Sequence, residues 1–199
     1  DNDDLFFYLV DSVKDQRKSL PRPIPKSLRL IWDASHSGAQ RDHNKELRQL
    51  EAYIKETGAR KISLSILRNT LEAPIEFDTS ETAAKLVAHL RSLQYDGATR
   101  MGLLDLTKTT ADATLVISDG VSTLGDTRPA IGDKPVFLFH AFQSAEHGLL
   151  TQLAAQSGGA YVNLHRKDTA AGLQALTTQR YSLLSVEGEG VEQVYPSVS

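Results

Sequence analysis

Short apolar runs alternate with longer amphipathic stretches along most of this chain, and this alternation limits the folds open to it. Leu28–Trp32, Leu115–Ile117 and Val136–Phe139 are continuous apolar runs apart from Arg29, which is typical of strands covered on both faces. Stretches with apolar residues at helical spacing lie between such runs. Strands that alternate with helices predict an α/β fold, here a doubly wound, mostly parallel sheet flanked by helices.

The helices are predicted from periodicity and from stop signals. Leu47, Leu50, Tyr53 and Ile54 recur at helical spacing before Gly58. A second helix is expected to open between Ser80 and Ala83, with Ala84, Leu86, Val87, Leu90 and Leu93 as its buried stripe. Besides the helix that opens at 80–83, the expected helices cover residues 40–57, 101–106, 146–156 and 169–178. The further strands are expected over residues 61–67, 75–77 and 161–164. Residues 120–134 are expected to form a long loop.

The two ends depart from this rhythm. Leu5–Val10 is a plausible strand, and the segment from Leu20 to Pro25 holds three prolines, which predicts a stiff extended connector. Residues 181–186 and 191–195 also resemble strands. We therefore expect an N-terminal strand and Pro-rich linker over residues 1–25, one domain over 26–180, and a C-terminal β segment over 181–199. The flanks would be shared with a neighbouring domain of a longer chain.

Composition excludes several function classes. The 199 residues suffice for one domain with a full core. The net charge of −3, from 22 basic and 25 acidic residues without a basic block, favours neither nucleic acid nor an anionic membrane as partner. The absence of cysteine excludes disulfides and thiolate zinc sites. The longest apolar run, Leu5–Val10, is far shorter than the roughly 20 residues of a membrane span.

Oxygen-bearing side chains cluster where the expected strands end. The strand Leu28–Trp32 runs into the pattern Asp-x-Ser-x-Ser, formed by Asp33, Ser35 and Ser37. Thr99 follows 66 residues after Asp33, and Asp119 stands 20 residues later, after a second apolar strand. Because the carboxyl ends of strands in a doubly wound sheet border one crevice, we expect these side chains to meet there.

Each of these residues also has an ordinary structural interpretation. Ser35 and Ser37 could cap a helix that begins near Ala39, and Thr99 could cap one that begins at Met101. Asp119, followed by Gly120, could simply form a turn. The combination, order and placement of all five at strand ends nevertheless favour a metal site over these separate roles.

The five residues, in this order, resemble the metal-ion-dependent adhesion site of von Willebrand factor type A domains, and the resemblance covers roughly residues 26–180. It implies a divalent ion, Mg²⁺ (or Mn²⁺ or Ca²⁺), held directly by the hydroxyls of Ser35, Ser37 and Thr99, with one or both carboxylates of Asp33 and Asp119 acting through water. It also implies protein–protein interaction of the cell-adhesion type, in which an acidic side chain of a protein partner completes the coordination. His36 and Arg100 are expected at the partner-binding rim.

A closer resemblance concerns proteins that combine two domains. The Pro-rich lead-in, Trp32 before Asp33, and the segment Tyr95–Thr99 are similar to those of bacterial proteins with a vault protein/inter-α-trypsin (VIT) domain beside a type A domain. This resemblance would explain the flanking strands as parts of a neighbouring domain of the same chain. The sequence leaves the compartment unknown, and only the usual setting of type A domains favours an extracytoplasmic or cell-surface location.

Other functions find less support in the sequence. The six histidines show no zinc-binding spacing, and the chain has neither a nucleotide-binding glycine motif nor a Gly-x-Ser-x-Gly nucleophile motif. An Mg²⁺-dependent hydrolase or phosphotransferase with Asp33 as nucleophile is the catalytic alternative, but dehalogenase-type phosphatases place a second Asp where this chain has Ser35. We therefore expect no enzyme activity; a structural module whose site stays empty is a third possibility. Arg41, Asp42, Lys45, Glu46 and Arg48 are expected on the solvent-exposed face of a helix.

Overall fold

A six-stranded sheet forms the centre of the molecule in the computed structural model, which describes residues 20–126 and 128–179. The strand order is β4-β3-β2-β5-β6-β7, and every neighbouring pair is parallel except β3 and β4. The strands are β2 (Ser27–Asp33), β3 (Lys61–Leu67), β4 (Ile75–Asp78), β5 (Ala113–Ile117), β6 (Val136–His140) and β7 (Ala160–Asn163). The predicted doubly wound α/β fold is confirmed.

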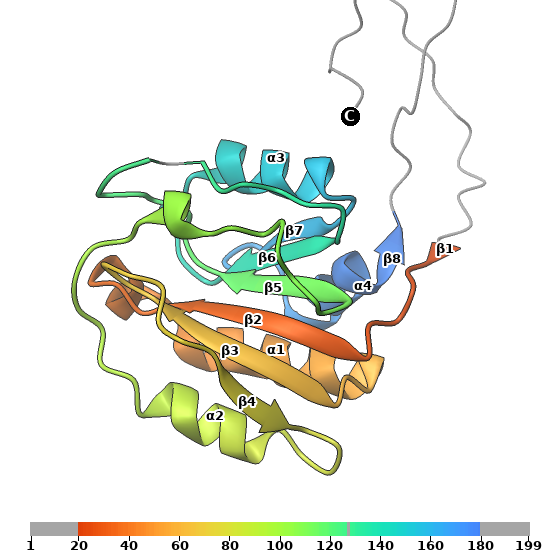
Figure 1. Ribbon diagram of the computed structural model, residues 1–199. Helices are drawn as coiled ribbons and strands as arrows, with labels where there is room; N and C mark the ends of the chain where they lie inside the picture. The colour runs from red at the N-terminus through yellow and green to blue at the C-terminus, as the bar shows by residue number, and fades with distance from the viewer. Residues whose placement is uncertain (1–19, 127, 180–199) are drawn as a thin grey trace, which may run out of the picture.

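Helices cover both faces of this sheet, as Figure 1 shows. One face packs against α1 (His43–Thr57), α2 (Ala84–Arg91) and α4 (Thr169–Thr177), and the other against α3 (His147–Gln156) and the short 3₁₀ helix η2 (Met101–Leu103). The strand order reverses between β2 and β5, because the chain extends the sheet on one side of β2 through β3 and on the other through β5. A ligand crevice is expected at the carboxyl ends of the two strands that flank such a switch point.

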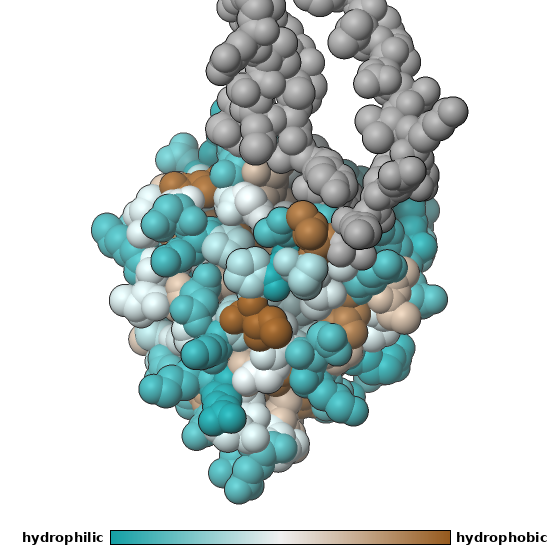
Figure 2. All heavy atoms as spheres, turned by 90° about the vertical axis from the view of Figure 1, so that its right-hand side faces the viewer, coloured by the Kyte–Doolittle hydropathy of each residue, from teal (hydrophilic) through white to brown (hydrophobic). Residues whose placement is uncertain are grey.

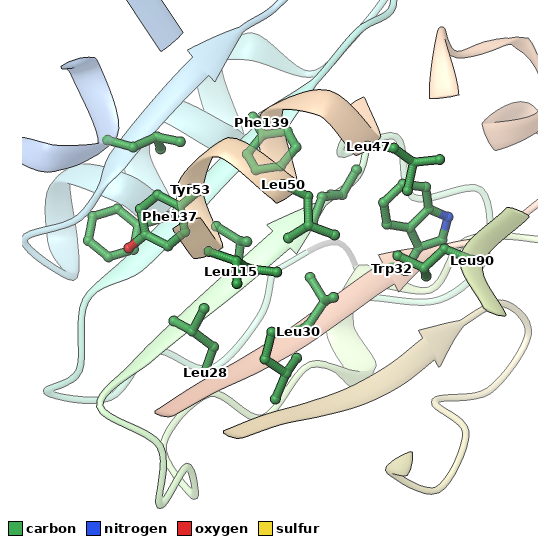
Figure 3. Close-up of a cluster of buried hydrophobic side chains, with 14 of the residues drawn as sticks. Leu28, Leu30, Trp32, Leu47, Leu50, Tyr53, Leu90, Leu115, Phe137 and Phe139 are labelled. Carbon is green, nitrogen blue, oxygen red and sulfur yellow. The ribbon is translucent and has the colours of Figure 1, made fainter. Parts of the chain in front are cut away.

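Two apolar clusters, one on each face, hold the layers together. The larger lies between the sheet and α1, where Leu47 and Leu50 pack over the strands, with Trp32 at one end and Phe137 at the other (Figure 3). Helix α1 begins at the Asp42 cap, whose side chain accepts from the Lys45 amide, and ends at Gly58, whose φ of 63° is left-handed. The smaller cluster includes Ile31, Val116 and Leu138 against α3 and η2.

The first and last described segments lie together at the opposite end of the sheet from the carboxyl ends of β2 and β5. β1 (Leu20–Pro21) pairs antiparallel with β8 (Thr178–Gln179). Arg22 fixes this pair, because its guanidinium donates to the carbonyls of Thr178 and Gly159, each at 2.9 Å, and lies over the ring of Phe137. Figure 2 views this end, where small hydrophobic patches lie among polar side chains.

Several local expectations differ from the structure. The helix expected over 40–57 begins only at His43, as α1, after a separate 3₁₀ turn, η1 (Ser37–Gln40). The helix expected over 101–106 is only the 3₁₀ turn η2. Leu20–Pro21, expected as connector, is the short strand β1. Ala84 is exposed instead of buried. The strands expected at Leu5–Val10, 181–186 and 191–195 lie outside the described residues.

The largest error concerns Arg41 and Glu46, which were expected on a solvent-exposed helix face. The structure buries both, with 4% and 0% of their surface exposed. Glu46 stands four residues before Leu50, which places it on the inward face of α1, and Arg41 precedes the helix and turns inward to meet it. No helix within residues 20–126 and 128–179 is long and apolar enough to cross a membrane.

Candidate metal centre

Asp33 and Asp119 lie on either side of the switch point. Asp33 is the last residue of β2, and Asp119 follows two residues after the end of β5. Both are almost fully buried, with 0% and 1% exposure. Burial raises the pKa of Asp119, the nearby charge of Asp33 raises it further, and a hydrogen bond from the hydroxyl of Ser37 acts in the opposite direction. The two buried carboxylates therefore lie close enough to repel each other, and a cation between them would relieve this repulsion.

The serine pair extends this crevice. The amide of Ser35 donates to Oδ1 of Asp33 at 3.0 Å, and the hydroxyls of Ser35 and Ser37 lie 3.2 Å apart. Neither serine caps a helix: η1 has no side-chain cap, and α1 is capped by Asp42. The capping interpretation of the two serines is therefore wrong.

The loop that carries Thr99 is hydrogen-bonded to the loop after β2 and to the loop after β5. The amide of Asp96 donates to the carbonyl of Ala34, and the amide of His36 donates to the carbonyl of Gly97. On the other side, the amide of Thr99 donates to the hydroxyl of Thr123 at 3.1 Å. These bonds place the Thr99 loop between the loop after β2 and the loop after β5.

The Thr99 hydroxyl has no hydrogen-bond partner in the described part of the chain, although the residue is only 1% exposed. It does not cap η2, which begins after Arg100 without a side-chain cap. A buried hydroxyl without a partner costs about 1–3 kcal/mol. The main-chain bonds place the Thr99 loop next to the loops of Asp33 and Asp119, where this oxygen fits a role as ligand to a hard cation, which prefers oxygen donors.

Asp119 combines its expected turn role with its place in the crevice. Its Oδ1 accepts from the amide of Val121 at 3.0 Å, and Gly120 takes a φ of 74°. Its carbonyl accepts from the amide of Glu146, so the same residue also fixes the start of α3. The turn interpretation therefore holds without excluding a role near a metal.

Ser118, which the sequence analysis did not single out, holds the other oxygen of Asp33. Its hydroxyl donates to Oδ2 of Asp33 and accepts from the amide of Gly120 at 3.0 Å. With Oδ1 bound by the amide of Ser35, each carboxylate oxygen of Asp33 has a fixed donor. The sequence feature that could have identified Ser118 is its position at the end of an apolar strand, next to Asp119.

The two residues expected at the rim differ in exposure. His36 is exposed, while Arg100 is half-buried and its guanidinium lies between the carbonyl of Asn69 and Gly125. None of the described carboxylates forms an ion pair with Arg100. A cavity of about 310 Å³ opens beside the loop that follows Asp119, and it is lined by Gly120, Val121, Ser122, Arg128, Glu146, Leu149 and Gln152.

The donor set differs from that of sites built on histidine and carboxylate clusters. Within the described ranges, no group of three or more His, Asp or Glu residues is arranged to hold a metal. The candidate centre instead combines two carboxylates with three hydroxyls. Such a set suits Mg²⁺, Mn²⁺ or Ca²⁺ better than zinc, because zinc in proteins favours nitrogen and sulfur ligands.

Comparison with known proteins establishes the fold. No sequence family and no curated protein matches the chain. Among solved structures, an aerotolerance-related membrane protein from Bacteroides fragilis NCTC 9343, carrying multiple mutations to serines, matches with a TM-score of 0.54 and 11% identity over 75% of this chain and 96% of that one. A von Willebrand factor type A protein from Catenulispora acidiphila matches with a TM-score of 0.53 and 12% identity over 75% of this chain and 40% of that one.

These likenesses and the strand order define a Rossmann-like α/β module. More specifically, the likeness to the Catenulispora protein makes the fold that of a von Willebrand factor type A domain.

Proposed function

We propose that this domain is a divalent-metal-dependent protein-interaction module. Ser35, Ser37 and Thr99 would bind Mg²⁺ or Mn²⁺ directly, and Asp33 and Asp119 would bind it directly or through water. The buried Thr99 hydroxyl without a partner is the observation that supports the proposal most strongly, because a bound cation would supply the interaction that this oxygen lacks.

The chemistry of the donors favours binding over catalysis. Hydroxyls are neutral ligands, so an ion with few direct carboxylate ligands keeps much of its positive charge and attracts an anionic ligand. A carboxylate from a protein partner is such a ligand. The proposed role is therefore adhesion through an acidic side chain, with no chemical step at the ion.

The proposed partner surface surrounds the centre. His36 and the half-buried Arg100 stand at its edge, and the cavity beside Gly120 and Ser122 offers space for a partner side chain close to the ion. The carbonyl of Thr99 accepts from the amide of Thr123 at 3.0 Å, so the loop that follows Asp119 also fixes a proposed metal ligand. Contact of a partner with this loop would therefore act on the centre itself.

The melting temperature in EDTA and in millimolar Mg²⁺ or Mn²⁺ tests the proposal. An ion at about 100 times its Kd stabilises a fold by about 2.7 kcal/mol. We expect metal to raise the melting temperature of the wild type and to leave that of Asp33→Ala unchanged. Equal melting temperatures of the wild type with and without metal would argue against binding in the free domain and favour the structural alternative.

A further inference from the structure

Arg41 is a buried cation that contacts the proposed metal ligand Asp33. Its Nη2 donates to the Asp33 carbonyl at 2.7 Å, and its Nη1 lies 3.9 Å from Oδ2 of the Asp33 carboxylate. The side chains of both residues are fully buried. One guanidinium therefore holds the main chain of Asp33 and faces its side chain.

Glu46 fixes Arg41 from the other side. Its Oε1 accepts from Nε of Arg41 at 3.0 Å and from the amide of Ala141 at 2.9 Å, immediately after β6. The carboxylate is thus anchored to the sheet, and the guanidinium is anchored to the carboxylate. The ring of Trp32 lies 5.9 Å from the guanidinium carbon and closes the pocket.

The close approach of the chain around Arg41 requires a glycine at position 38. A Cβ at Gly38 would lie 2.8 Å from Nη1 of Arg41 and 3.0 Å from the Asp33 carbonyl. Gly38 directly follows Ser37, so the loop with the candidate ligands is shaped around the guanidinium. The ion pair and the metal loop form one packed unit.

Fold stability alone does not account for this arrangement. Removing two charges from water costs several kcal/mol per ion, and a buried pair often adds little net stability. Nη1 of Arg41 also has no hydrogen-bond partner among the described residues, so the pair is incompletely satisfied. The unsatisfied nitrogen faces the Asp33 carboxylate, which indicates a role at the metal centre.

We propose that Arg41, anchored by Glu46, is a positioning residue that orients Asp33 and sets the affinity of the centre for a divalent ion. This inference rests on the proposed function. The positive charge beside Asp33 offsets part of the charge of the two carboxylates, which limits neutralisation of the ion and preserves its attraction for a partner's carboxylate. Glu46 limits that offset, because it shares the guanidinium with Asp33.

Two substitutions separate geometry from charge. Arg41→Lys keeps the charge but cannot reach Glu46 and the Asp33 carbonyl together, because a single ammonium replaces the fork of the guanidinium. Glu46→Gln keeps an acceptor for the Ala141 amide but removes the carboxylate that shares the charge of Arg41, so that the full charge acts on Asp33. The matched control is Arg91→Lys, whose exposed parent side chain donates to Asn44 of α1 at 3.0 Å.

Titration with Mn²⁺, with the free ion counted by its electron paramagnetic resonance signal, tests the inference. We expect Arg41→Lys to weaken Mn²⁺ binding at least tenfold, Glu46→Gln to weaken it several-fold, and Arg91→Lys to bind like the wild type. The melting temperature in EDTA identifies variants that are folded at the titration temperature. If Arg41→Lys fails to fold, the Mn²⁺ affinity of Glu46→Gln tests the inference.

The outcomes separate this inference from the proposed function. If the wild type binds Mn²⁺ and the folded variants bind it equally well, the role of Arg41 and Glu46 is overturned while the metal centre stands. If the wild type itself does not bind Mn²⁺, the proposed function fails, and this inference fails with it.

Discussion

At the scale of single residues, the candidate centre is unusual in what it leaves unsatisfied. Both oxygens of Asp33 have fixed donors, from Ser35 and Ser118, whereas the buried hydroxyl of Thr99 has no partner among the described residues. A fold would gain stability by replacing that oxygen with a methyl group. The proposed metal ion would supply the partner that this oxygen lacks.

Thr99→Val provides the corresponding prediction. In EDTA, the variant should be as stable as the wild type or more stable, by roughly 1 kcal/mol, because it removes a buried polar atom without a partner. In millimolar Mn²⁺, most of the metal-dependent rise in melting temperature should be lost. Thermal melts under both conditions measure the two effects.

Thr114→Val is the matched control. Thr114 lies in β5, is 1% exposed, and also has a hydroxyl without a partner in the described structure. This variant should gain stability in EDTA and keep the full response to Mn²⁺. An unchanged Mn²⁺ response in Thr99→Val would show that Thr99 is not a ligand.

At the scale of elements, the end of β6 introduces a pH dependence. His140 is fully buried; its Nδ1 accepts from the amide of Phe142, so the proton is on Nε2, which donates to the hydroxyl of Tyr161 at 2.7 Å. The pKa of His140 is lowered to about 4, chiefly by burial and in smaller part by electrostatic interaction with His147, Arg41 and His165. The folded state therefore keeps this imidazole neutral.

The free energy of unfolding should fall as the pH drops from about 6.5 to about 4. In this window the unfolded chain binds a proton at His140 that the folded chain does not, at a cost of at most about 1.4 kcal/mol per pH unit. His140→Asn retains an acceptor for the Phe142 amide and removes the titration. Urea unfolding at several pH values should show a flatter dependence for the variant, and parallel curves for the two proteins would contradict the assignment.

Elements were predictable where the sequence pattern is local. The apolar runs gave the strands of the main sheet, and periodicity with Gly58 gave α1, because these signals depend only on neighbouring residues. The 3₁₀ turns were not predictable as such, because tertiary contacts decide whether a short segment such as Met101–Leu103 continues into a helix.

At the scale of the whole molecule, the carboxyl ends of β2 and β5 at the switch point lie at the opposite end of the sheet from the β1–β8 pair. The meeting of Asp33 and Asp119 could be predicted because carboxyl ends of parallel strands lie at one edge of a sheet, although the two residues are 86 positions apart in the sequence. Arg41, Glu46 and Ser118 were missed because their roles depend on long-range contacts, such as that of Glu46 with the Ala141 amide. Arg41 and Glu46 were expected to be solvent-exposed because they are charged.

The central claim is that a divalent ion binds between the loops after β2 and β5. The most direct measurement is an anomalous difference map from crystals of the domain soaked in Mn²⁺. The account predicts one peak within bonding distance of the hydroxyls of Ser35, Ser37 and Thr99, with Asp33 and Asp119 contacting the ion directly or through water. A map of a fully soaked crystal with no peak there, or with a peak only at other residues, would contradict it.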